Sequence, residues 1–69
     1  MPISFMSVGS RHRIKAVNGS DSVKKHLGDL GFVEGAEVTV VNETAGSLIL
    51  GIHDSRVAVN RDLAIRILV

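Results

Sequence analysis

Apolar and polar residues alternate in short segments along most of this chain, and this pattern restricts its fold more than any other feature. A side-chain period of two is typical of half-buried β-strands, and it recurs over residues 11–17, 36–42, 47–52, 56–59 and 64–69. One region differs: Val23, Leu27 and Leu30 have helical spacing. Ser20 or Ser22 can cap the start of this helix, and a glycine at position 31 can end it in a left-handed conformation.

We therefore expect a mainly β domain of about five antiparallel strands, with one short helix between strands 1 and 2. A small sheet of this kind removes its exposed edges by curling into a barrel. We assign residues 9–69 to this barrel and residues 1–8 to a flexible arm, from which Phe5 and Met6 can dock on the core or on a partner. The polar break at residues 60–62 suits a single 3₁₀ turn, after which Ile65, Ile67 and Val69 are expected to share one face.

The composition argues against several classes of protein. The chain has no Cys, hence no disulfide and no thiolate metal site, which suits a reducing cytosol. Its apolar runs are too short for a membrane-spanning helix. A net charge of +1 argues against a dedicated nucleic-acid binder. Two Phe residues, without Trp or Tyr, supply neither a base-stacking platform nor an aromatic groove for proline-rich peptides.

The sequence contains no recognisable set of catalytic residues. No serine lies in a G-x-S-x-G motif. The glycines of residues 28–35 fall within and after the expected helix, whereas a phosphate-binding loop precedes one. His12, His26 and His53 are 14 and 27 residues apart, so none pairs at the i, i+3 or i, i+4 spacing of a helical metal site. We expect a protein that is not an enzyme and has no cofactor, with at most a weak divalent-metal site at these histidines.

A basic stripe on the first expected strand is a candidate partner surface. Arg11, Arg13 and Lys15 share one face of that strand. Such a stripe is either an ordinary solvated face or a docking site for an acidic protein surface or for lipid headgroups. The helix offers a second candidate surface at Lys24 and Leu27.

Apolar residues also occur on faces that should point outward. Val41, Ile49 and Leu68 each oppose the inward residues of their strand. Val41 and Ile49 belong to neighbouring strands of an expected hairpin, so they can be adjacent. Isolated exposed apolar residues are ordinary, but adjacent ones form a patch that indicates an interface with a partner or with a second copy.

Two motifs resemble those of FeoA-type domains. Residues 27–38 are similar to the pattern L-x-x-L-G-φ-x-x-G-x-x-V, and residues 64–69 are similar to a tail of the form A-x-x-I-x-V. The resemblance covers residues 9–69. The motif positions, which we interpret as architectural, are Leu27, Leu30, Gly31, Gly35, Ala64, Ile67 and Val69.

The resemblance implies an SH3-like β-barrel and a role in prokaryotic ferrous iron uptake. FeoA proteins are small cytosolic companions of FeoB, a membrane transporter with a cytosolic G-protein domain, and they are thought to bind or regulate it. The family has no catalytic residues to carry over. The same fold occurs as the C-terminal domain of metal-dependent transcriptional repressors, which is the alternative interpretation. We thus expect a cytoplasmic, non-catalytic protein that binds FeoB without entering the membrane itself, with weak self-association left open.

Overall fold

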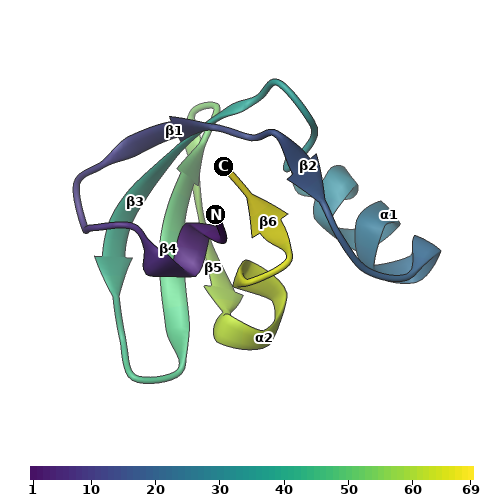
Figure 1. Cartoon of the computed structure of the whole chain (residues 1–69). Coiled ribbons are helices and arrows are strands. Elements are labelled where there is room, and N and C mark those ends of the chain that lie inside the picture. The colour runs from purple at the N-terminus through teal and green to yellow at the C-terminus, as the bar shows by residue number, and fades with distance from the viewer.

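The strands form two antiparallel sheets in the computed structural model, which describes residues 1–69 (Figure 1). The larger sheet has the order β1-β3-β4-β5, from Arg11–Arg13, Glu37–Glu43, Ser47–Ile52 and Ser55–Asn60. The smaller sheet pairs β2 (Ala16–Val17) with β6 (Ile67–Leu68). The helices are η1 (Ile3–Phe5), α1 (Asp21–Asp29) and α2 (Arg61–Ala64). The expected mainly β architecture is therefore confirmed, with α1 between the first strands and the central hairpin.

The segment expected as a single first strand is divided between the two sheets. Arg11–Arg13 pairs with β3, and Ala16–Val17 pairs with β6. The chain changes sheet at Ile14, whose backbone exchanges two hydrogen bonds with the loop before β3: its N–H donates to Ala36 O at 2.9 Å, and its carbonyl accepts from Gly35 N at 2.8 Å. The alternation of apolar and polar residues predicted which side chains of this segment are buried, but not which strands it pairs with.

The helix α1 begins and ends where the sequence predicts. The Ser20 hydroxyl accepts a hydrogen bond from Val23 N at 3.3 Å, which caps the first turn. At the other end, Phe32 N donates to Leu27 O and Gly31 N donates to Gly28 O, each at 2.9 Å. This double closure is a Schellman motif, and Gly31 supplies its positive φ of 105°.

The C-terminal segment differs from the expected six-residue strand. A short α-helix, α2, replaces the expected 3₁₀ turn, and the Asn60 side chain caps it by accepting from Leu63 N at 3.0 Å. Because α2 runs through Ala64, only Ile67 and Leu68 remain as a strand. The prediction that Ile65 shares the inward face is wrong: it follows α2 and is 48% exposed, while Ala64 and Ile67 are fully buried.

The first eight residues do not form the expected flexible arm. Ile3 is fully buried in the core, and Met6 packs against the core. Pro2 pairs with Leu68, and Val69 N donates to Met1 O at 2.8 Å. The amino-terminal segment thus pairs with β6 through a single β-bridge, in addition to the pairing of β6 with β2. Phe5 is 70% exposed and so remains available to a partner, and Met1 and Val8 are exposed as well.

The core is formed only by apolar side chains, which come from every layer of the molecule. The β-strands supply most of it through their inward positions, and η1, α1 and α2 each add a residue. These residues are Ile3, Ile14, Leu27, Phe32, Val38, Val40, Leu48, Leu50, Ile52, Val59, Ala64 and Ile67.

Candidate functional site

The outer face of the four-stranded sheet carries one row of residues that crosses all four strands. Arg11 on β1 pairs in register with Thr39 on β3. Thr39 in turn pairs with Gly51 on β4, and Gly51 pairs with Arg56 on β5. An arginine therefore stands at each end of the row, and the two central positions are small. In an antiparallel sheet, register partners present their side chains on the same face.

This arrangement creates an open concavity of about 460 Å³. Gly51 leaves its centre free of a side chain: a Cβ at this position would lie 3.3 Å from Val41 Cγ2 and 3.7 Å from Thr39 Cβ. The rim and floor of the concavity, which we call the outer-face concavity, consist of Arg11, Glu37, Thr39, Val41, Gly51, His53, Asp54, Ser55 and Arg56.

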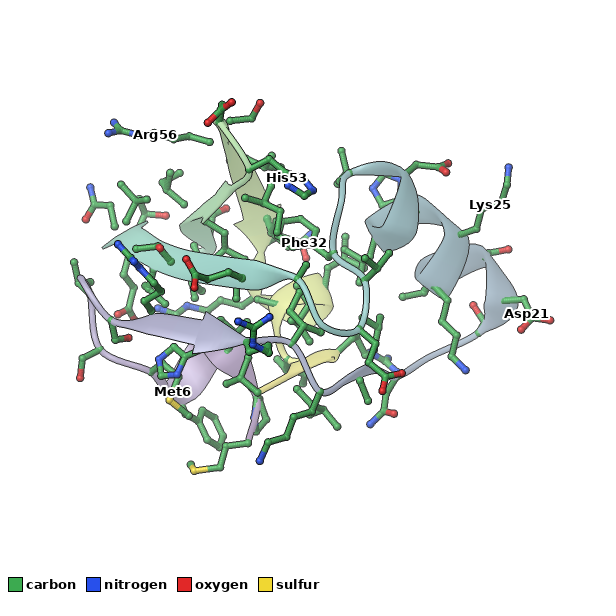
Figure 2. The ribbon with its side chains drawn as sticks, turned by 90° about the horizontal axis from the view of Figure 1, so that it is seen from above. Met6, Asp21, Lys25, Phe32, His53 and Arg56 are labelled. Atoms are coloured by element: carbon green, nitrogen blue, oxygen red, sulfur yellow. The ribbon has the colours of Figure 1, made fainter.

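The charges around the outer-face concavity are only partly paired. Arg11 Nη1 lies 3.6 Å from Glu37 Oε1, and both side chains are more than half exposed, so this pair adds little stability. Arg56 and Asp54 have no ion-pair partner. Figure 2 shows Arg56 projecting away from the body of the molecule, on the side opposite α1. A partner that carries an acidic group can therefore meet Arg56 without breaking a contact within the chain.

Val41 and Ile49 lie on this same outer face, as the sequence predicts. Ile49 stands between the inward residues Leu48 and Leu50 and is half-buried. A bulge interrupts the β3–β4 register between Val40 and Asn42, so that Asn42 pairs with Ile49 and Val41 has no partner across the strand. Val41 instead covers the Gly51 backbone. Val41 is thus the one apolar residue that lines the concavity, and Ile49 lies on the same face outside it.

The other predicted surface residues do not join this face. Leu68 lies in the two-stranded sheet, opposite Ala16 and Pro2. Leu27 is fully buried, so it is a core residue and the prediction of a surface role for it is wrong. Its side chain points inward because it stands on the single buried stripe of α1. Lys24 stays exposed on the solvent side of that helix.

The basic stripe of Arg11, Arg13 and Lys15 is divided in the structure, because the strand expected to carry it is divided between the two sheets. Arg11 borders the outer-face concavity. Arg13 Nη1 donates a hydrogen bond to Gly35 O at 2.8 Å and so holds the loop before β3. Lys15 follows the bend at Ile14, where its backbone N–H donates to Leu68 O in the other sheet. The three cations therefore have three different local environments.

The motif residues are mainly architectural, as expected, with one exception. Leu27, Ala64 and Ile67 are fully buried, and Val69 packs against the core. Gly31 and Gly35 have φ values of 105° and 87°. The exception is Leu30: it caps the end of α1 and is 37% exposed, because the Schellman turn directs it away from the core.

The three histidines lie in separate environments. His12 Nε2 is 2.8 Å from the Ser10 hydroxyl, and His26 is exposed in the last turn of α1. His53 occupies the β4–β5 turn with a φ of 54°, and its ring points toward the loop that follows α1 (Figure 2). No group of three or more His, Cys, Asp or Glu side chains is arranged to hold a metal ion.

Sequence reasoning missed Thr39, Gly51 and Arg56. Gly51 interrupts an apolar strand, and a glycine inside a strand often marks a place of close approach; this was the one available signal. The importance of Arg56 depends on the register that aligns it, across β4 and β3, with Arg11, which is far from it in sequence. None of the three helices is long and apolar enough to cross a bilayer.

Comparisons with known proteins agree with this fold. The family model for the FeoA domain matches residues 1–69. A crystal structure of the iron uptake regulatory protein FeoA has 24% identity and a TM-score of 0.90, covering 97% of this chain and 91% of that one. The zinc complex of Stenotrophomonas maltophilia FeoA has 24% identity and a TM-score of 0.85, covering 99% and 87%. It is described as an SH3 domain protein and a candidate ferrous iron transport activating factor.

One solved structure comes from a different functional class. A manganese-dependent transcriptional repressor has 14% identity and a TM-score of 0.86, with 97% of this chain and 39% of that chain covered. At this identity the likeness concerns the fold alone. No curated protein matches the chain.

Proposed function

Because the chain belongs to the FeoA domain family, we propose that it is a non-catalytic accessory protein of ferrous iron uptake. In this proposal it works in the cytoplasm and binds the cytosolic part of the FeoB transporter. The family match over residues 1–69 is the observation that carries the proposal. The likeness to a candidate ferrous iron transport activating factor supports it.

The outer-face concavity is the surface that we propose for this contact. It combines an apolar side chain, Val41, with an unpaired guanidinium at Arg56, and Ile49 lies outside it on the same face of the sheet. Protein interfaces draw most of their binding energy from a few partly apolar anchors, with charges that orient the partner. A partner segment that presents an apolar side chain next to a carboxylate meets both requirements.

A binding titration with the isolated cytosolic part of FeoB tests the proposal. We expect Val41→Asp to weaken binding at least about tenfold, because it places a negative charge on the one apolar residue that lines the concavity. Ile65→Asp is the matched control: Ile65 is 48% exposed, follows α2 and does not line the concavity, so its affinity should stay within about twofold of wild type.

Two results would count against the proposal in different ways. Equal affinities for Val41→Asp and wild type would remove the outer-face concavity as the contact surface. A complete lack of binding with every nucleotide state of the G-protein domain would remove FeoB as the partner.

The second candidate function is that of the C-terminal domain of a metal-dependent repressor. The likeness to the manganese-dependent repressor favours it, and this chain spans less than half of that protein. The coding sequence decides between the two. A winged-helix region upstream in the same reading frame would favour the repressor, and an adjacent gene for a membrane GTPase would favour iron transport.

A further inference from the structure

Strand β5 is an outer edge of the four-stranded sheet, and its backbone is unpaired on one side. The sheet order ends at β5, and β6 pairs with β2 rather than with it. In antiparallel pairs, the N–H and C=O of successive residues point alternately to opposite sides of the strand. Arg61 N, just after β5, donates to Gly46 O, just before β4, at 3.2 Å. The backbone groups of every second residue counted back from Arg61 therefore point toward β4.

This alternation identifies the free backbone groups. Since the N–H of Arg61 points toward β4, the N–H and C=O groups of Val59 and Val57 do so too, and those of the residues between them point away. Arg56 and Ala58 therefore present their N–H and C=O groups at the open edge. Both residues are exposed, and no hydrogen bond to their backbone is present elsewhere in the chain.

The two edges of the sheet differ in how they are protected. The opposite edge, β1, is three residues long and has arginines at both of its ends. Short length and charge are the usual devices that prevent pairing with another chain. The β5 edge is six residues long and has a single charge, at Arg56.

We propose that β5 is a dimerisation edge, which pairs antiparallel with β5 of a second copy about a two-fold axis at Ala58. In this register Ala58 faces Ala58 of the other copy, and each Arg56 faces an Asn60. Two arginines never stand opposite each other, and the smallest side chain of the strand lies on the axis. The edge is therefore self-complementary, as an isologous interface requires.

The dimer would join two four-stranded sheets into one continuous sheet of eight strands. Both outer-face concavities would lie on the same surface, because Arg56 belongs to the concavity and to the edge. The inference does not depend on the proposed function, since it concerns only contacts between copies of this chain.

Sedimentation equilibrium over a range of concentrations tests the proposal. We expect wild type to shift from the mass of one chain to that of two as the concentration rises. Ala58→Pro removes one edge donor and leaves the β4 ladder intact, because proline is tolerated at edge positions. Ala58→Lys puts like charges opposite each other on the axis. Both variants should stay monomeric with a wild-type circular dichroism spectrum, and the control Ala58→Ser should dimerise.

Oxidative cross-linking gives a second measurement that does not depend on a proline substitution. The chain has no cysteine, so Ala58→Cys introduces a single thiol. Opposed residues of a hydrogen-bonded pair have Cα atoms about 5.5 Å apart, within the range of a disulfide. We expect Ala58→Cys to form disulfide dimers at least about tenfold faster than the control Ser22→Cys, exposed on α1. A wild type that stays monomeric at all concentrations, dimers that survive Ala58→Pro or Ala58→Lys, or equal cross-linking rates would each overturn the proposal.

Discussion

The imidazole ring of His53 lies directly against the backbone of Gly31. A Cβ placed on Gly31 would be 3.1 Å from His53 Cδ2 and 3.2 Å from His53 Nε2. The contact joins the turn that ends α1 to the β4–β5 turn, two segments that are separated by more than twenty residues. Gly31 is therefore constrained twice, by its positive φ and by this ring.

We predict that Gly31→Ala lowers the free energy of unfolding by at least about 1–2 kcal/mol, the usual penalty for a side chain in a left-handed backbone. Urea unfolding followed by circular dichroism measures the change. His53→Ala removes the ring, so the double variant should be less destabilised than the sum of the two single variants. Strict additivity would show that the ring contact contributes nothing.

The amino-terminal segment should contribute to stability through one residue. Ile3→Ala is expected to destabilise the protein by about 2–5 kcal/mol, since it leaves a cavity in the core. Phe5 is 70% exposed, so Phe5→Ala should change the unfolding free energy by less than about 0.5 kcal/mol. Thermal unfolding of both variants checks this pair. If Ile3→Ala proved as mild as Phe5→Ala, the segment would be a mobile arm after all.

Arg61 links α2 to the β3–β4 hairpin. Its guanidinium group donates to the Glu43 carboxylate, to Thr44 O and, through Nε, to Ala45 O, the last two at 3.2 Å. Arg61→Ala should cost about 1 kcal/mol and increase hydrogen exchange at Ser47. Arg61→Lys should restore little of this, because an ammonium group cannot span three acceptors. Full recovery with lysine would mean that only the charge matters.

Filling the outer-face concavity should affect binding more than stability. Gly51→Val adds a β-branched side chain against Val41, and we expect stability to change by no more than about 1 kcal/mol. Affinity for the cytosolic part of FeoB should fall markedly. Gly46→Val is the matched control, because nothing lies within 4 Å of a Cβ at Gly46. Equal affinities of these two variants would argue against the concavity.

The alternation of side chains was sufficient to predict which residues of the central hairpin face the core. Val38 and Val40, and likewise Leu48, Leu50 and Ile52, are all buried, because a period of two fixes the face once the strand is known. The cap and the Schellman turn of α1 were also predictable, since they depend on residues close in sequence.

What sequence reasoning missed depends on contacts between distant segments. Ile3 has no periodic neighbours that could mark it as a core residue. The packing of η1 against α2 and the bridge between Pro2 and Leu68 place it in the core. The bend at Ile14 follows from hydrogen bonds to the loop before β3. The row that joins Arg11 to Arg56 requires the register of four strands at once, which no local pattern contains.

Backbone amide NMR spectra recorded while the cytosolic part of FeoB is added would locate the contact surface residue by residue. We expect the largest shifts at Thr39, Val41, Ile49, Gly51 and Arg56. The amides of α1 around Lys25, on the far side of the molecule in Figure 2, should stay unchanged. Shifts confined to α1, or spectra unchanged at saturating partner, would contradict this expectation.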